Sequence, residues 1–450
     1  MKLYKLSAVM FSALLLASCS DIDNQEYAGG AISGEQSQET NSAIPSRTKA
    51  TFAGMFTLIG DPCHNYQTHF SDTRPDDFGF VMSAISLDLE GADMSMQDNG
   101  YNWFSASDEL SSRNANYANP YVRYVIPYTS LGIANDIINA FPADTKDAEA
   151  INMIAQAKTI RAFDYLSLAP YFQGSYQTSK DKPCVPLLDG KNDYTNNPRA
   201  TVAEVYTAII DDLSYAIDNL TDAREDKSRI NKSVALGLRA RAYLYMGEYA
   251  KALVDAEAAM KGYTPASLAD VSVPGFDDSS ASNWMWTYDL TDDQVASAAA
   301  SYATAASWMS AFCGQGYAVA TGNVPMINKL LYDKIPATDV RKGWWLDENL
   351  HSPLLANLEW KDSKGNVLAK GDAIAPLKIK DVKEPLVAYA NVKSGMKSGV
   401  GSSKNNNSWP LMRVEEMILI EAECLAQTGN EAKAKEVLAN FVKTYRDPSY

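Results

Sequence analysis

Aromatic side chains are concentrated in three short clusters of this 450-residue chain. The clusters are Tyr101-Asn102-Trp103-Phe104, Trp284-Met285-Trp286-Thr287-Tyr288 and Trp344-Trp345. On an extended segment, alternate residues such as Trp284 and Trp286 project to the same side. Flat aromatic rings pack against the C–H faces of sugar rings, and small-ligand pockets combine apolar walls with a few placed polar groups. We therefore predict that the ligand-binding residues are Tyr101, Trp103, Trp284, Trp286, Tyr288, Trp344 and Trp345.

The tryptophans lie in two loop-rich regions or at their margins. Residues 60–120 and 263–410 are rich in Gly, Pro, Ser, Asn and Asp, which predicts loops with small helices and a few short strands. Loops on a rigid scaffold commonly carry binding residues. For any one tryptophan, the alternative is that the ring packs its loop onto that scaffold.

Catalytic and metal-binding signatures are missing from the sequence. It has no H-E-x-x-H, G-x-S-x-G or G-x-x-x-x-G-K-[ST] motif. Its histidines are His64, His69 and His351. Acidic pairs such as Asp277-Asp278 could flank a glycosidic bond, but sequence neighbours on a loop point in different directions. We expect a binding protein that is not an enzyme and has no cofactor and no metal site; a helical glycosidase is the alternative.

The charge and the cysteines narrow the choice of partners. The net charge is −15 at pH 7, which repels phosphate backbones but not a neutral ligand, so we expect no nucleic-acid partner. Besides Cys19, the cysteines are Cys63, Cys184, Cys313 and Cys424. None forms a C-x-x-C pair, and the gaps are too long for a zinc knuckle or a redox motif. This pattern leaves the presence of disulfides open.

The amino terminus has the form of a lipoprotein signal peptide. Lys2 and Lys5 precede a mostly apolar run from Leu6 to Ala17, which is shorter than the roughly 20 residues of a membrane-spanning helix. Leu16-Ala17-Ser18-Cys19 resembles the lipobox of bacterial lipoproteins, in which the Cys carries a lipid. We predict that residues 1–18 are removed and that Cys19 is lipidated; an ordinary signal peptide with an incidental Cys is the alternative.

A tether and one folded domain are predicted after the signal peptide. Residues 19–50 are polar and poor in large apolar side chains, which favours a flexible segment. No later stretch approaches membrane-spanning length. We therefore predict a single domain over residues 51–450 that is attached to the membrane by its lipid.

The elements that would position the aromatic loops are helices. Apolar residues recur with the 3.6-residue helical period over residues 201–220, where Thr201 and Glu204 have the spacing of a capping box. Long helices are also expected over residues 128–141 and over residues 148–169, where a proline would end the second one. The predicted fold class is mainly α.

Two predicted helical hairpins can be laid over each other. The residues Ala240, Gly247, Ala252 and Ala259 match Ala422, Gly429, Ala434 and Phe441 at identical offsets of 7, 5 and 7 residues. Small residues let the two helices approach closely, as in the tetratricopeptide repeat, whose hairpins stack into a superhelix. We predict a tetratricopeptide-like scaffold over residues 121–262 and 411–445, interrupted by the second loop-rich region; a generic helical hairpin is the alternative.

The ordered set of these features resembles the SusD/RagB family. The resemblance rests on the lipobox at Cys19, the segment Ile160–Tyr165, the helix over residues 201–220 and the hairpins over residues 231–262 and 411–443. Within these hairpins, Ala235–Gly247 looks like the family's tetratricopeptide helix, and Trp409–Met417 looks like the entry to its late hairpin. The resemblance covers most of the chain after residue 50.

The resemblance implies a lipid-anchored nutrient-binding subunit on the outer surface of the outer membrane. Such a protein captures an oligosaccharide or polysaccharide and delivers it to a TonB-dependent (SusC-like) transporter, with its scaffold facing the transporter and its loops holding the glycan. Asp21 and Asp23 resemble the family's surface-export signal. The alternative function is a tetratricopeptide-type scaffold lipoprotein that only recruits other proteins.

The carboxyl end departs from the family pattern. Members usually continue past the late hairpin with an E-x-x-x-E-G-x-R-like segment, whereas this sequence ends at Tyr450 without it. A natural short form and a truncated product are both open at this point.

Overall fold

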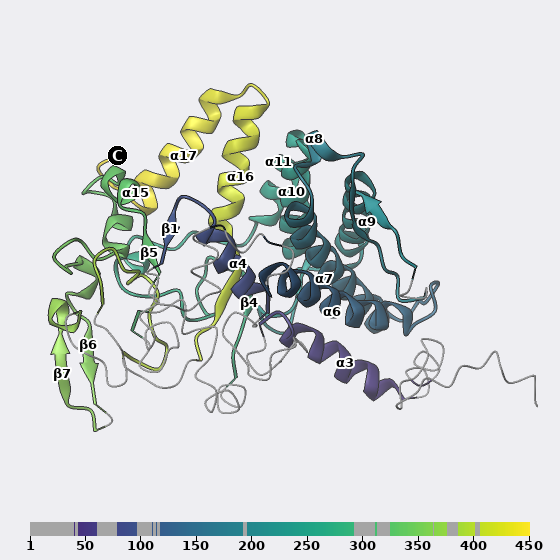
Figure 1. The fold of residues 1–450 in the computed structure, drawn as a ribbon, viewed down its shortest axis with the longest axis horizontal. Helices are drawn as coiled ribbons and strands as arrows, with labels where there is room; N and C mark the ends of the chain where they lie inside the picture. The colour runs from purple at the N-terminus through teal and green to yellow at the C-terminus, as the bar shows by residue number, and fades with distance from the viewer. Residues whose placement is uncertain are drawn as a thin grey trace, which may run out of the picture.

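The computed structural model describes most of the chain between residues 44 and 450. The described residues are 44–60, 79–96, 118–191, 196–291, 325–362, 364–375, 386–400 and 406–450, with Thr40, Leu110, Asn114, Ala311 and Phe312 besides. Helices dominate this part of the chain and its strands are short (Figure 1). The prediction of a mainly α fold is confirmed.

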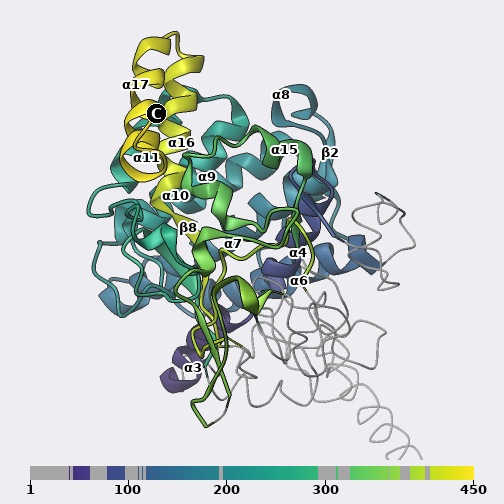
Figure 2. The same ribbon diagram turned by 90° about the vertical axis from the view of Figure 1, so that its left-hand side faces the viewer.

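Long helices stack side by side, and they remain stacked when the view is turned (Figure 2). Each of them packs against the next one in the following order: α6 (Ala118–Asn139), α7 (Ala148–Phe172), α9 (Val202–Asn219), α10 (Lys232–Met246), α11 (Tyr249–Ala259), α16 (Val414–Gln427) and α17 (Glu431–Tyr445). α11 and α16 are neighbours in space although the second loop-rich region separates them in the sequence. This arrangement confirms the predicted scaffold of stacked hairpins with an insertion.

Smaller helices surround this stack. α3 (Pro45–Thr57) and α4 (Gly79–Leu89) pack against α6. The short helices are α8 (Tyr176–Ser179), α15 (Lys329–Lys334) and the 3-10 turns η3 (Asp270–Ser272), η5 (Val340–Trp344), η6 (Pro353–Leu355) and η7 (Gly371–Ile374). Among the described helices, none combines the length and the apolar character that a membrane span requires.

Local chemistry explains where the scaffold helices begin and end. At the start of α9, Thr201 N–H donates to Glu204 Oε2 at 2.7 Å and Glu204 N–H donates to Thr201 Oγ1 at 3.2 Å. This is the predicted capping box, and it satisfies two N–H groups that a helix start leaves free. α10 ends at Gly247 with φ +78°, and the turn before α17 contains Gly429 with φ +82°. Glycine adopts this left-handed conformation without steric cost, so both hairpin turns are tight.

Two predicted helix boundaries are wrong. α6 begins at Ala118, well before residue 128, and contains Pro127. α7 continues past Pro170 to Phe172. A proline inside a helix removes one backbone hydrogen bond. The buried faces of α6 and α7 pack against each other, and this packing offsets the lost hydrogen bond in each helix.

The described strands form four two-stranded antiparallel sheets. The pairs are β1 (Met94–Ser95) with β5 (Met326–Ile327), β2 (Pro183–Pro186) with β3 (Arg199–Thr201), β4 (Trp284–Tyr288) with β8 (Trp409–Arg413), and β6 (Glu359–Lys361) with β7 (Val367–Lys370). The β4–β8 pair matters most, because β8 leads directly into α16. It joins the loop-rich region to the last hairpin of the scaffold.

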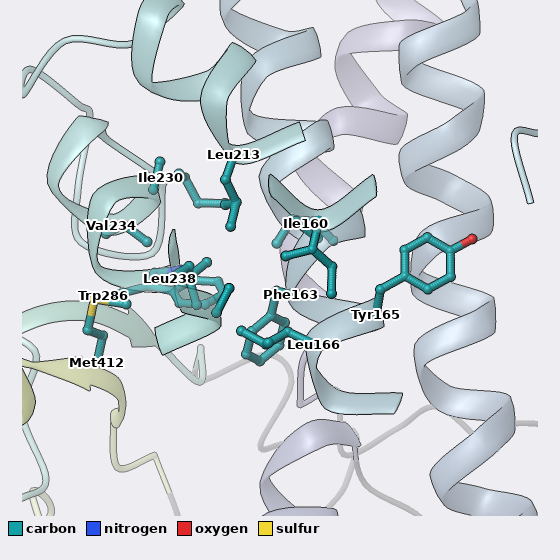
Figure 3. Packing of buried hydrophobic residues seen from close by; sticks show 14 of the residues in the cluster. Ile160, Phe163, Tyr165, Leu166, Leu213, Ile230, Val234, Leu238, Trp286 and Met412 are labelled. Atoms are coloured by element: carbon teal, nitrogen blue, oxygen red, sulfur yellow. The ribbon is translucent and has the colours of Figure 1, made fainter. Parts of the chain in front are cut away.

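The scaffold and the loop-rich region each have a hydrophobic core. The larger core includes Phe163, Leu238 and Trp286 (Figure 3). The rings of Phe163 and Trp286 meet edge to face with centroids 5.0 Å apart, a favourable geometry for aromatic pairs. A second core, around Leu346 and Leu355, lies within the loop-rich region. The loop-rich region therefore has a hydrophobic core of its own.

Candidate functional site

The cluster around Trp284 and Trp286 is a buried strand. The side chains of Trp284, Trp286 and Tyr288 are 1%, 0% and 3% exposed. Every residue of β4 is buried, so the alternation of side chains leaves no outer face. Trp286 also donates its Nε1–H to the carbonyl oxygen of Ser228 at 3.2 Å. The prediction that this cluster presents exposed rings to a ligand is wrong, because β4 lies between the scaffold and the loop-rich region.

Other predicted positions lie outside the described residues. These are Tyr101, Trp103 and the lipidation site Cys19, and their roles stay predictions. Cys184 and Cys424 are buried free thiols. Within the described part of the chain, no group of three or more His, Cys, Asp or Glu side chains is arranged to hold a metal ion.

Trp344 and Trp345 are partly exposed. Trp344 ends η5, and its Nε1–H donates to the carbonyl oxygen of Val271 at 2.9 Å. The backbone of Trp345 pairs with that of Asn391 in an isolated antiparallel bridge. These contacts fix the two rings at the surface of the loop-rich region. Ligand contact by these rings stays a prediction.

The structure places a lysine against these two rings. Lys393 Nζ lies 5.4 Å from the ring centroid of Trp344, 5.8 Å from that of Trp345 and 5.3 Å from that of Phe276. The rings of Phe276 and Trp344 meet edge to face at 5.6 Å. We call Phe276, Trp344 and Trp345 together the aromatic cage. Each of these distances lies within the range at which the face of an aromatic ring attracts a cation.

Phe276 reaches this position through an unfavourable backbone conformation. Its φ is +59°, a left-handed conformation that costs a residue with a side chain roughly 1–2 kcal/mol. Neighbouring hydrogen bonds maintain it: Gly275 N–H donates to the carbonyl oxygen of Lys393 at 2.7 Å, and Gly395 N–H donates to that of Gly275 at 2.6 Å. The Phe276 loop and the Lys393 loop are thereby held together. Strain of this kind is commonly found at binding sites.

Arg413 adds a second positive charge beside the aromatic cage. Its Cζ lies 5.2 Å from the centroid of Phe276. Burial and the charge of Arg413 lower the pKa of Lys393 to about 8, while Asp88 acts in the opposite direction. Lys393 is therefore mostly protonated at neutral pH. Among the ion pairs of the described residues, none contains Lys393 or Arg413.

A cavity of about 380 Å³ adjoins the aromatic cage. Phe276, Asn283 and Trp284 contribute to its wall, as do Asp277 and Asp278. Burial raises the pKa of Asp277, whereas hydrogen bonds from Ser280 lower the pKa of Asp278. The cavity thus combines apolar walls with polar groups, and its volume is in the range of small-molecule sites.

A second cavity, of about 450 Å³, lies between α7 and α9. Its main charged groups already bind each other: Arg161 donates to both carboxylate oxygens of Asp212 at 2.7 and 2.8 Å and to Asn135 Oδ1 at 2.7 Å. Tyr165 OH accepts the Leu188 N–H at 2.7 Å. This network stabilises the scaffold, so the first cavity and the aromatic cage are the candidate ligand site.

Part of the helical scaffold matches a known protein family. Residues 80–244 match the SusD-like family model described as "Starch-binding associating with outer membrane". This segment contains α6, α7 and α9 and most of α10. Over this segment the chain is similar to the SusD-like family.

Two curated relatives of this SusD-like chain match part of it. A SusD-like protein of Bacteroides ovatus is 30% identical over 123 residues, which are 26% of this chain and 21% of the relative. SusD-like protein P2 of Formosa agariphila is 24% identical over 261 residues, which are 57% of this chain and 46% of the relative. The matches therefore span less than half of each relative.

Solved structures share the SusD-like fold over most of the chain. A SusD-like carbohydrate binding protein of Bacteroides vulgatus superposes with a TM-score of 0.66 at 19% identity, covering 89% of this chain and 75% of that one. A SusD superfamily protein of Bacteroides thetaiotaomicron gives a TM-score of 0.63 at 20% identity, covering 90% and 81%. At these identities the likeness concerns the fold.

Sequence reasoning did not single out three residues of this SusD-like site. Phe276, Lys393 and Arg413 come from three separate segments. Phe276 and Lys393 belong to no local motif, and Arg413 lies in the Trp409–Met417 segment, which pointed to the entry of the late hairpin and not to a ligand site. The Trp344-Trp345 pair was the available signal, because a pair of adjacent tryptophans stands out in the sequence. Their partners depend on how the loops pack.

Proposed function

We propose that this SusD-like chain captures glycans at the cell surface and delivers them to a TonB-dependent outer-membrane transporter, without catalysing a reaction. The observation that carries the proposal is the partly exposed Trp344-Trp345 pair beside a cavity of about 380 Å³. The family description, "Starch-binding associating with outer membrane", supports it.

The physical basis is stacking on aromatic rings. A sugar ring would lie against the exposed parts of Trp344 and Trp345, while polar groups at the cavity, such as Ser282 and Asp278, would bond its hydroxyls. Sites of this kind combine apolar contact area with a few placed polar groups. No step of this function requires a nucleophile or a general acid.

The proposed setting follows from the amino terminus. We propose that residues 1–18 are a signal peptide, that lipid on Cys19 anchors the chain to the outer membrane and that residues 19–50 are the tether. The folded domain would then face the cell exterior. Mass spectrometry of the membrane-extracted protein tests the anchor: a diacylated or triacylated Cys19 supports it, and an unmodified cysteine contradicts it.

Affinity electrophoresis tests glycan capture. The mature protein would be run through gels that contain neutral or charged plant, host or microbial polysaccharides, including starch. We expect retardation by at least one of them and its loss in the Trp344→Ala, Trp345→Ala double variant. Tyr245→Ala is the matched control, because Tyr245 is an aromatic residue 44% exposed on α10. Retardation by none of the polysaccharides, charged ones included, would sink the proposed function.

A protein-recruiting scaffold is the second candidate function. It is favoured by apolar residues that remain exposed on the stacked helices, among them Val254 at 63% on α11 and Leu419 at 52% on α16. Co-purification with a TonB-dependent transporter addresses both functions. Transporter binding together with glycan binding supports capture and delivery, whereas transporter binding by a chain that binds no glycan supports the scaffold alone.

A further inference from the structure

Two positive charges meet at the aromatic cage without a negative partner. Lys393 Nζ and the Arg413 guanidinium lie 5.3 and 5.2 Å from the same ring, that of Phe276. Within the described part of the chain, neither has a carboxylate at ion-pair distance. Like charges this close disfavour each other, and partial burial weakens the screening by water.

Acidic residues are available nearby but are engaged elsewhere. Asp278 follows Phe276 closely in the sequence, yet it pairs with Lys397 at 3.2 Å. Asp277, between them, lies against Gly395 rather than in an ion pair. Asp88, on α4, is the acid whose charge favours protonated Lys393, and it too is outside ion-pair distance of the ammonium. Among the described residues, the two cations therefore lack the carboxylate partner that Arg161, Arg239 and Arg446 have.

The backbone at Phe276 adopts an unfavourable conformation that places its ring beside the two cations. Phe276 has a left-handed φ of +59°, and its loop is bonded to the Lys393 loop on both sides of Gly275. This strained residue places its ring against both cations. A purely structural lysine would not need such a support, because a lysine side chain is long enough to place its ammonium in water.

We infer that Lys393 and Arg413, held by Phe276, form a subsite for the anionic substituent of a glycan. The inference rests on the proposed function and names its substrate class: a polysaccharide that carries carboxylate or sulfate groups. The sugar ring would stack on Trp344 or Trp345 while its anionic group lies between the ammonium and the guanidinium. Arg offers paired donors that suit both carboxylate and sulfate oxygens.

Matched ligand pairs test the subsite. One pair is polygalacturonate and its fully methyl-esterified form; the other is a sulfated galactan and the same galactan after desulfation. Each pair differs in charge but keeps the sugar backbone. Because the chain has a net charge of −15, general electrostatics would oppose binding of either polyanion, so a preference for the charged form requires a local site.

We expect the protein to bind the charged member of at least one pair about tenfold more tightly than the neutral member, as a charge-assisted contact implies. The pair that shows the preference identifies carboxylate or sulfate as the group. Lys393→Met and Arg413→Met should each abolish the preference, so that the charged and the neutral member of each pair bind these variants equally. Lys370→Met is the matched control: it also removes one positive charge, from an exposed lysine on β7 that lies 3.6 Å from Glu359, and it should retain the preference.

The pH dependence gives a second readout. The pKa of Lys393 is lowered to about 8 by burial and by Arg413, against the opposing effect of Asp88. The preference should therefore weaken as pH rises from 7 to 10, and it should do so less in Lys393→Met, which has already lost that charge. Rising salt should weaken it as well.

Three outcomes would overturn the subsite. They are equal binding of charged and neutral members in both pairs, an unchanged preference in Lys393→Met and Arg413→Met, and an equal loss in the Lys370→Met control. Binding of neutral glycans together with any of these outcomes leaves the proposed function standing and removes only the subsite.

Discussion

The β4–β8 pair and the aromatic cage both gather aromatic rings and positive charges from distant segments, but they leave them in different states. Beside β4, the tryptophan rings are 0–1% exposed, and Arg446 pairs with Glu415 at 3.1 Å. At the aromatic cage, the rings are partly exposed and Lys393 has no carboxylate within ion-pair distance among the described residues. In the first region the buried charge of Arg446 is paired within the chain, although Trp409 Nε1 on β8 is buried without a hydrogen-bond partner among the described residues. The role of this region is to hold the fold. The second has partly exposed rings and, among the described residues, a lysine without a carboxylate partner, which suits a ligand site.

In the first region, the buried Glu415 carboxylate has several hydrogen-bond partners. Its Oε1 accepts hydrogen bonds from Ala266 N–H at 3.1 Å, from Asn283 Nδ2 at 2.9 Å and from Arg446 Nη2 at 3.1 Å. The carboxylate thus joins the start of α16 to the loop-rich region and to the segment after α17. A buried charge with this many partners offsets much of its desolvation cost.

The largest effect separates the tryptophans of the two regions. Trp286→Ala should lower the free energy of unfolding by about 4 kcal/mol, because it leaves a large cavity in the core. Trp345→Ala should cost about 1 kcal/mol, since its ring is already partly exposed. Urea unfolding followed by circular dichroism measures both. Similar losses for the two variants would remove the distinction between a structural ring and a binding ring.

The next effect concerns a paired cation. Arg446→Met should destabilise the fold by about 3 kcal/mol, because Glu415 would stay buried without its positive partner. The Arg446→Met, Glu415→Gln double variant should cost less than the sum of the two single changes, since each single change leaves the other group unpaired. Additive losses in thermal unfolding would show that the pair is not coupled.

The scaffold was predictable because its signals are local. The capping box at Thr201 and Glu204, the turn at Gly247 and the apolar stripes all lie within a few residues of the structure that they specify. The role of β4 was not predictable from its own residues, because alternating tryptophans suit an exposed strand as well as one covered on both faces. Its burial depends on its pairing with β8, which is distant in the sequence. The aromatic cage depends on three loops that meet in space, which leaves no trace in the spacing of Phe276 and Lys393.

A smaller effect is expected for the unpaired cation. Lys393→Met should change the free energy of unfolding at pH 7 by less than about 1 kcal/mol, and toward higher stability, because it removes a partly buried charge that faces Arg413. The same Lys-to-Met exchange at an ordinary surface position, Lys370, is the control. A loss as large as that of Arg446→Met would mean that Lys393 has a negative partner and that the two regions do not differ in this respect.

The smallest effect is the pH dependence of the difference in stability between Lys393→Met and the wild type. The pKa of Lys393 is about 8 in the folded chain and has an ordinary value of 10.5, so between these two values the unfolded chain binds more protons than the folded one. Stability contributed by this group therefore rises as pH increases from 8 to 10.5, and the cost of the buried charge is fully present below pH 8. The stability advantage of Lys393→Met over the wild type should accordingly shrink between pH 7 and pH 10, which paired thermal unfolding curves at the two pH values would measure. If the advantage grew with pH instead, the pKa of Lys393 would be higher in the folded chain than in the unfolded chain. The aromatic cage would then be a paired site like that of Arg446 and Glu415.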